Sequence, residues 1–257
     1  MFRDKLFYYL ANYTSQHSFE KEIIKLIKKE RKLVIFDVGC YRGIFVRSIL
    51  NLIGKKKHKF YLFDINKKVK NYIANLLKFK NFYYNEIALC NKNGIANYNY
   101  NKFFESAGSS LSNIVKNDAR WNFSRKLIFK FLFINTENFI KYNTENFIKY
   151  KVPTITLDNF VKKNKIKSID ILKIDIEGSE YELLKGSKNT LKLNKIKIIL
   201  VEIMGKKNNY LKKEKKILNL LKKRNFTLIK KVDIWSISLF SNIKGADYLL
   251  INNKYLK

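Results

Sequence analysis

Apolar residues along the chain gather in short runs, and each run ends in polar or charged residues. Four such runs lie at 33–36, 60–63, 169–176 and 196–201. Runs of this length that are apolar almost throughout are typical of strands buried on both faces of a parallel sheet. The pattern therefore predicts parallel strands, with polar side chains delivered at their carboxyl ends.

Helical spacing appears after the second run. Apolar residues there recur at the spacing of one helix face, at Val69, Tyr72, Ile73, Leu76 and Leu77. Asn66 precedes them as a candidate cap. The alternation of strands and helices with short connections predicts a doubly wound α/β fold. No apolar run approaches the ~20 residues that cross a bilayer.

The first strand leads into a glycine-containing turn. Asp37 ends the strand, and Gly39 and Gly43 bracket the turn before the next helix. This G-x-x-x-G spacing lacks the G-x-G-x-x-G fingerprint that binds a dinucleotide pyrophosphate. An acidic residue in the loop suits the amino acid and sulfonium of S-adenosylmethionine (SAM) better than a phosphate. An ordinary strand-to-helix turn would explain the same residues.

The second strand also ends in an acid. Asp64 lies 25 residues after Gly39 (64 − 39). An acid at this position of a βαβ unit can accept hydrogen bonds from both ribose hydroxyls of a nucleoside. The alternative is that Asp64 only starts the following helix.

The run at 169–176 carries charges at alternate positions, Lys173, Asp175 and Glu177. Alternate residues of a strand share a face, so we expect these side chains to line one side of the sheet edge. If SAM is the cofactor, Asp175 is the candidate residue that orients the molecule accepting the methyl group or serves as general base, with Glu177 next. Lys173 could neutralise a neighbouring carboxylate or hold the methyl acceptor. An internal ion pair that only shapes the strand end is the alternative. Glu202, at the end of the run at 196–201, is a further candidate acid.

These segments, taken in order, resemble the FkbM family of SAM-dependent methyltransferases over roughly residues 33–203. The residues that carry the resemblance are Phe-Asp-Val-Gly at 36–39, Gly43, Phe63, Asp64, Ala88, Thr-Leu-Asp-Asn-Phe at 156–160, Lys-Ile-Asp-Ile-Glu-Gly-Ser-Glu at 173–180, Leu-Lys-Gly at 184–186 and Glu202. The Thr-Leu-Asp segment followed by Lys-Ile-Asp-Ile-Glu-Gly is the specific part. Two departures stand out: Cys40-Tyr-Arg replaces the usual Ala-Asn and a variable residue, and Asp64-Ile65 replaces Glu-Pro.

The resemblance implies a Rossmann-like class I methyltransferase fold. This is a seven-stranded, mostly parallel sheet with helices on both faces and an antiparallel last strand. The segments 226–231 and 246–251 are candidates for its final hairpin. It implies SAM as the cofactor, with Asp64 at the ribose, Asp37 and Gly39 at the methionine end, and the segment 85–88 near adenine. The full set of expected cofactor residues is Asp37, Gly39, Cys40, Tyr41, Gly43, Asp64, Ile65, Glu86 and Ala88.

The expected organisation is an N-terminal helical extension at 1–32 and a single methyltransferase domain at 33–257. Within the domain, residues 97–152 are expected to form a variable insertion on the acceptor side. This stretch contains a perfect tandem repeat, because Asn-Thr-Glu-Asn-Phe-Ile-Lys-Tyr at 135–142 is followed at once by the same eight residues at 143–150. Two short copies are too few for a solenoid.

The formal charge of +32 raises the question of a nucleic-acid partner. The positive charge is nearly all lysine and is spread over every expected helix, which is typical of A/T-rich coding at tolerant surface positions. The chain has a single proline, Pro153, so it lacks the Pro-Pro-Tyr turn of adenine methyltransferases, and neither cysteine follows a proline. We therefore do not expect a nucleic-acid partner, while attraction to an acidic lipid surface stays open.

Cys40 and Cys90 lie far apart, and His17 and His58 form no cluster, so neither a disulfide framework nor a metal site is indicated. The start of the chain is a poor signal peptide, and a cytoplasmic location is expected. The expected function is SAM-dependent O-methylation of a sugar, a glycan or another small polar acceptor. The alternatives are an RNA methyltransferase, which predicts a contiguous basic groove beside Asp175, and a non-catalytic nucleotide- or glycan-binding protein. The sequence leaves the oligomeric state open.

Overall fold

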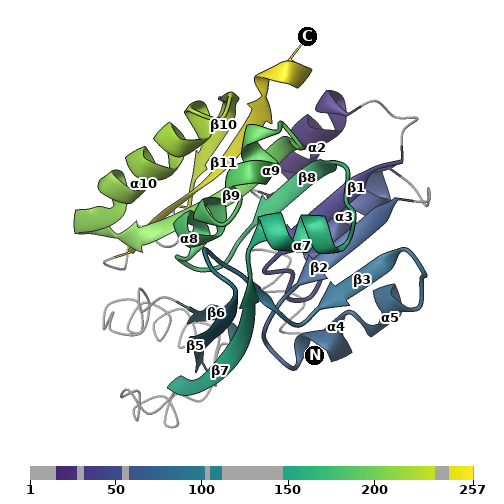
Figure 1. The fold of residues 1–257 in the computed structure, drawn as a ribbon, viewed down its shortest axis with the longest axis vertical. Coiled ribbons are helices and arrows are strands. Elements are labelled where there is room, and N and C mark those ends of the chain that lie inside the picture. The colour runs from purple at the N-terminus through teal and green to yellow at the C-terminus, as the bar shows by residue number, and fades with distance from the viewer. Residues whose placement is uncertain are drawn as a thin grey trace, which may run out of the picture.

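A computed structural model of the chain describes residues 16–27, 32–53, 58–101, 105–111, 147–234 and 243–256. Within these ranges, seven strands form one sheet in the order β10-β11-β9-β8-β1-β2-β3 (Figure 1). The strands are β1 (Val34–Val38), β2 (Lys59–Phe63), β3 (Phe82–Asn85), β8 (Ile169–Ile174), β9 (Ile196–Lys206), β10 (Phe226–Asp233) and β11 (Ile243–Asn252). Strand β11 is antiparallel to both of its neighbours, whereas β3, β2, β1, β8 and β9 pair in parallel. The predicted class I methyltransferase sheet is confirmed.

Helices cover both faces of this sheet (Figure 1). One face carries α2 (Gln16–Leu26), α3 (Ile44–Ile53), α4 (Val69–Tyr72) and α5 (Ala74–Leu77). The other carries α7 (Leu157–Lys163), α8 (Glu180–Lys185), α9 (Lys188–Lys192) and α10 (Lys207–Lys222). All six residues of β8 are buried because both of its faces are covered. Ile171 belongs to the same core cluster as Ile23 and Val46 on the α2 side, and its neighbour Leu172 belongs to the cluster of Phe160 on the α7 side.

A second, smaller sheet lies beside the main one, at the bottom of Figure 1. It has the order β4-β7-β5-β6, with β4 (Ala88–Leu89), β5 (Gly94–Asn101), β6 (Glu105–Ser110) and β7 (Phe147–Ile155). Strand β5 pairs antiparallel with both β6 and β7, and the short β4 pairs parallel with β7. The ends of the expected insertion at 97–152 thus belong to these strands.

Three predicted boundaries were wrong. The strand expected at 169–176 ends at Ile174, where its pairing with β1 and β9 stops. Glu177 and Gly178 then turn the chain, with φ angles of 52° and 109° that extended strands do not adopt. The strand expected at 196–201 continues to Lys206 because β11 pairs with it over its whole later half, so Glu202 lies inside the strand. The helix expected over 69–77 is divided at Ile73, whose φ of −100° and ψ of 9° are not helical.

Two parts of the expected organisation fall partly outside the described residues. Helix α2 lies within the N-terminal extension at 1–32. Its Phe19 and Ile23 are buried, as is Ile27 directly after it. Residues 1–15 and 28–31 are outside the description. Residues 147–150 of the second octapeptide copy lie in β7, whereas residues 135–146 are outside the described part of the chain. The domain limits of the sequence analysis stay a prediction.

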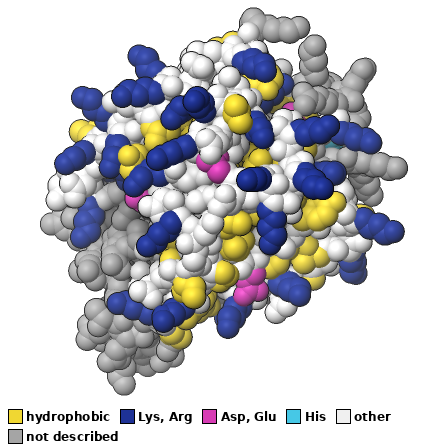
Figure 2. Space-filling model, in the orientation of Figure 1, with side chains coloured by type: hydrophobic (Ala, Val, Ile, Leu, Met, Phe, Trp, Pro, Cys, Tyr) yellow, Lys and Arg dark blue, Asp and Glu magenta, His cyan; other side chains and the backbone are white. Residues whose placement is uncertain are grey.

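Lysine and arginine side chains are spread over the described part of the face seen in Figure 2, between small apolar areas and a few acids. Among the described residues, no helix is both long and apolar enough to cross a membrane.

Candidate active site

The turn after β1 is bound to the end of β2. The N–H groups of Gly39 and Cys40 both donate to the carbonyl of Phe63, at 2.9 and 3.1 Å. Gly43 N–H closes the turn on the carbonyl of Cys40 at 2.7 Å. Gly39 and Gly43 have φ angles of 79° and 68°, the left-handed region that glycine adopts without strain. The backbone conformation therefore explains why glycine occupies both positions of the predicted loop.

Tyr41 and Cys40, which replace the usual loop residues of the family, face different surroundings. The Tyr41 ring meets Tyr72 edge-on at 5.6 Å, and the Arg42 guanidinium lies 4.9 Å from the Tyr72 ring centroid. Cys40 is buried, and burial raises the pKa of its thiol well above the usual value. Cys40 thus fills space beneath the loop, and Tyr41 packs over α4.

Asp64 connects the two strand ends. Its Oδ2 accepts from Tyr41 N–H and its Oδ1 from Asn66 N–H, both at 2.9 Å. Burial raises the pKa of Asp64 to about 6, although these hydrogen bonds act in the opposite direction. Each carboxylate oxygen has a second acceptor position, so two hydroxyl donors can still be taken. Asn66 itself accepts from Lys68 N–H at 3.0 Å, in the turn before α4 rather than at its first residue.

The remaining expected cofactor residues lie where the second sheet meets the loop after β2. Ile65 and Ala88 pack in a small cluster with Tyr98 and Tyr150. The Tyr150 hydroxyl donates to the carbonyl of Ile65 at 3.2 Å. Glu86 is exposed in the connection between β3 and β4. The structure thus groups Ala88 with Ile65 and leaves Glu86 at the surface.

At the end of β8, one ammonium group lies between two carboxylates. Asp37 and Lys173 are direct neighbours in the β1–β8 register. Lys173 Nζ lies 3.4 Å from Asp37 Oδ1 and 3.1 Å from Asp175 Oδ2. Burial alone would lower the pKa of Lys173, but Asp175 and Asp37 outweigh it and raise the pKa. Burial raises the pKa of the fully buried Asp37, whereas Lys173 and Glu202 outweigh burial at Asp175 and lower its pKa.

Asp175 lines a pocket on the α2 side of the sheet, together with three further acids: Glu20, Glu202 and Asp247. The pocket is lined by Phe19, Glu20, Phe45, Lys173, Ile174, Asp175, Leu200, Glu202 and Asp247. Glu202 and Asp247 are paired across β9 and β11. Burial and the charge of Asp175 raise the pKa of Glu202 well above its usual value, and a hydrogen bond joins the two carboxyl groups. Burial also raises the pKa of Asp247 to about 7, with Asp175 adding to the effect.

The sequence analysis missed Asp247 and Glu20. Asp247 lies in the antiparallel last strand, and Glu20 lies in a helix that precedes the first motif. The run at 246–251 was recognised as a strand, so the one acid within it was the signal that could have pointed to Asp247. Glu177 does not share the strand face of Lys173, because it follows the strand in a left-handed conformation. Its charge nevertheless acts on Glu202.

The residues present fit SAM. Asp37 places a wholly buried carboxylate beneath the glycine loop, suited to the cofactor's amino group. Asp64 keeps acceptor capacity for two hydroxyls at the tip of β2, and Ala88 with Ile65 offers an apolar surface for a base. When bound, SAM supplies an electrophilic methyl group. In the described part of the chain, no three His, Cys, Asp or Glu side chains are grouped so as to hold a metal ion.

The fold and this set of residues define a class I SAM-dependent methyltransferase. The model of the methyltransferase FkbM domain family matches residues 37–228, and the chain belongs to that family. It is a SAM-dependent enzyme, as the resemblance implied.

Solved structures with related folds are distant in sequence. Methyltransferase FkbM from Methylobacillus flagellatus KT is 10% identical, with a TM-score of 0.48, over 84% of this chain and 43% of that one. The present chain thus spans less than half the length of that protein. N-methyltransferase NodS from Bradyrhizobium japonicum WM9 is 7% identical over 92% of this chain and 96% of that one, with a TM-score of 0.42. M. capricolum TrmK, solved with S-adenosylhomocysteine, is 16% identical over 91% and 67%, with a TM-score of 0.42. No curated protein matches the sequence.

Proposed function

We propose that this enzyme methylates a hydroxyl group of a sugar, a glycan or another small polar acceptor. The observation that carries the proposal is the pocket beside Lys173, in which Asp175, Glu202 and Asp247 lie together. Methyl transfer to a hydroxyl forms a carbon–oxygen bond as the carbon–sulfur bond breaks, and the hydroxyl proton must pass to a base. A group of acids with separated pKa values supplies such a base.

The three acids divide the work in the proposal. Asp175 has a lowered pKa and is ionised at neutral pH, so it accepts a hydrogen bond from the acceptor and orients it. Glu202 has a raised pKa, so it stays protonated and donates a hydrogen bond to the ionised Asp175. The pKa of Asp247 is about 7, which suits a base that takes up the hydroxyl proton at neutral pH.

Cofactor binding is the first test. Calorimetric titration of S-adenosylhomocysteine into the wild-type protein is expected to show micromolar affinity. Asp64→Ala is expected to weaken it by about 1–3 kcal/mol, the cost of removing a hydrogen-bonding partner from a polar ligand. A folded wild-type protein that binds no S-adenosylhomocysteine would favour a non-catalytic role.

Acceptor class is the second test. Methyl transfer from labelled SAM is measured separately with polysaccharide, small-metabolite and RNA fractions of a cell extract. Label in the first or second fraction is expected, reduced at least tenfold by Asp175→Asn and Asp247→Asn. Asp233→Asn is the control, since the Asp233 side chain is 51% exposed and does not line the pocket. Label confined to RNA contradicts the proposal. We also propose a cytoplasmic location for the enzyme, and recovery of the protein outside the cytoplasmic fraction of the cell would contradict that.

A further inference from the structure

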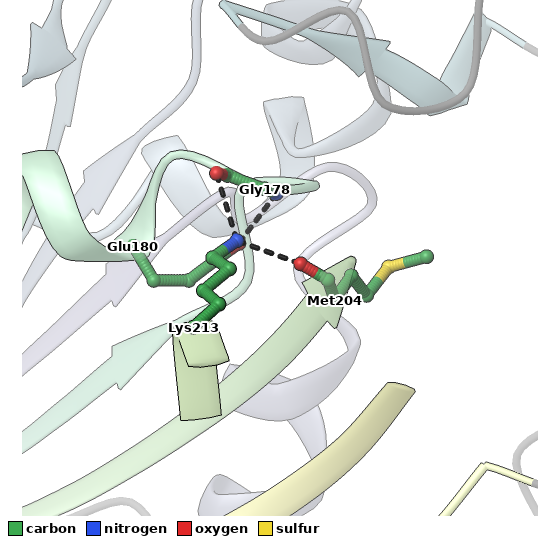
Figure 3. A network of polar contacts seen from close by, with 4 residues as sticks. All are labelled: Gly178, Glu180, Met204 and Lys213. Carbon is green, nitrogen blue, oxygen red and sulfur yellow. Dashed lines mark hydrogen bonds and ion pairs between the residues drawn. The ribbon is translucent and has the colours of Figure 1, made fainter. Parts of the chain in front are cut away.

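A lysine of α10 holds the loop that follows β8. Lys213 Nζ donates to the carbonyl of Gly178 at 2.8 Å, to Glu180 Oε2 at 2.5 Å and to the carbonyl of Met204 at 2.7 Å (Figure 3). We call these four residues the Lys213 network. An ammonium group has three protons, so all of its donors are used within the network.

The network binds Gly178 from both sides. While Lys213 takes the Gly178 carbonyl, the Gly178 N–H donates to Glu180 Oε1 at 2.5 Å. Glu180 is wholly buried. Burial raises the pKa of Glu180, and the charge of Lys213 opposes that rise. The ion pair therefore keeps an ionised carboxylate available to the Gly178 N–H inside the protein.

The loop held in this way is the one that carries Asp175. Gly178 follows Asp175 by three residues, and the intervening Glu177 has a left-handed φ of 52°. A non-glycine residue in this region persists when its surroundings fix it. Asp175 N–H donates to the carbonyl of Val38 at 2.9 Å, and the Asp175 carbonyl lies against Gly39. A shift of the loop would therefore reach the glycine turn after β1 as well as the carboxylates of the pocket.

We propose that Lys213 is a positioning residue, which holds the loop at 175–179 in the conformation that the cofactor requires. Lys213 lies on α10, which contributes no residue to the pocket, so it acts through Gly178 and Glu180. The inference rests on the proposed use of this loop in methyl transfer. No motif of the sequence pointed to Lys213, one of many lysines in α10.

Four variants separate positioning from stability. Lys213→Met removes the ammonium and leaves Glu180 buried without its cation. The double variant Glu180→Gln with Lys213→Met removes that buried charge too, so it regains part of the lost Tm, while the carbonyls of Gly178 and Met204 stay without the lysine. Glu180→Gln alone completes the cycle. Lys212→Met is the matched control, because Lys212 is the exposed neighbour on the same helix.

Two readouts are measured well below the Tm of every variant: amide hydrogen exchange of the peptide covering 175–180, and calorimetric affinity for S-adenosylhomocysteine. We expect Lys213→Met and the double variant both to exchange at least tenfold faster in this peptide and to bind at least tenfold more weakly. Lys212→Met should match the wild type in both readouts.

Wild-type exchange in Lys213→Met would overturn the inference, because the loop would not depend on the lysine. Affinity that recovers together with Tm in the double variant would overturn it as well, since the role would then be structural alone. If the wild type binds no S-adenosylhomocysteine, the proposed function fails, and the exchange measurement still decides whether Lys213 holds the loop.

Discussion

The carbonyl oxygen of Asp175 occupies the space where a side chain on Gly39 would lie: a Cβ on Gly39 would be only 1.8 Å from it. The two loops of the site therefore touch through their backbones. Glycine is required at position 39 both by this close approach and by the positive φ angle. Gly39→Ala must displace one loop, because the atom that it meets is backbone. We expect it to weaken S-adenosylhomocysteine binding at least 30-fold, equivalent to ~2 kcal/mol, by calorimetry.

Gly94→Ala is the control for conformation alone. Gly94 also has a positive φ, 134°, but a Cβ there would meet nothing within 4 Å. Gly94→Ala should lower Tm. It should change the affinity for S-adenosylhomocysteine by no more than about twofold, which corresponds to a few tenths of a kcal/mol. Equal losses of affinity in the two variants would mean that the contact with Asp175 does not matter.

A strictly structural role is predicted for Asp158, which lies in the segment most specific to the family. Asp158 accepts from Asn189 N–H, Thr190 N–H and the Thr190 hydroxyl, at 2.9, 2.7 and 2.7 Å. It thus caps α9 from the neighbouring helix α7. Asp158→Ala should lower the free energy of unfolding by about 1.5–3 kcal/mol, because three donors lose their acceptor.

Affinity for S-adenosylhomocysteine should stay unchanged in Asp158→Ala, measured below its Tm. Asn159→Ala, an exposed neighbour whose backbone N–H is bound by Thr156, serves as the control for stability. A loss of affinity without a loss of stability would place Asp158 in the site instead.

The sequence predicted this fold well because the buried strands are apolar almost throughout. Charged residues near the ends of such parallel strands must meet at one sheet edge, and Asp37 and Lys173 are indeed register neighbours. The motif could not tell structural from functional residues: Gly186, also in the family pattern, lies where a Cβ would be 2.0 Å from the Cys90 carbonyl. Asp247 and Lys213 were missed since each comes from an element whose local pattern is that of an ordinary strand or helix.

Removal of Lys173 should be costly. Lys173→Met leaves Asp37 and Asp175 without the ammonium that lies between them, and breaking a buried ion pair costs about 3–5 kcal/mol. Without this cation the pKa values of both acids rise, so the folded state favours their protonated forms. The stability deficit of the variant should therefore be smallest near pH 4 and grow as the pH rises to 8. Chemical denaturation at several pH values measures it.

The double variant Lys173→Met with Asp37→Asn is the matched comparison, because one of the two stranded charges is gone. It should recover part of the deficit at pH 8 and little of it at pH 4. A deficit of Lys173→Met that does not change with pH would show that lost packing, rather than stranded charge, causes it.

Tyr150, at the end of the second octapeptide copy, connects the second sheet with the loop after β2. Its hydroxyl donates to the carbonyl of Ile65, next to Asp64. Tyr150→Phe keeps the ring and removes this bond, which is worth about 0.5–1.5 kcal/mol. We expect S-adenosylhomocysteine affinity to fall by about three- to tenfold. Tyr83→Phe, on an exposed ring stacked on Tyr61, should change nothing, and equal behaviour of the two variants would contradict the prediction.

Asp64 should make cofactor binding depend on pH. Burial raises its pKa to about 6 in the free protein, above the ordinary value of 3.8. The folded state therefore favours the protonated acid, and the stability associated with this shift is present below pH 4 and lost as the pH rises through 6. Ribose hydroxyls that donate to Asp64 favour the ionised form, so the affinity for S-adenosylhomocysteine should rise by about tenfold between pH 5 and pH 7. Asp64→Asn cannot ionise and should bind with nearly constant affinity over the same range, and the two are compared by calorimetry. If wild type and Asp64→Asn show parallel pH profiles, Asp64 only supports Tyr41 and Asn66, and the ribose is held elsewhere.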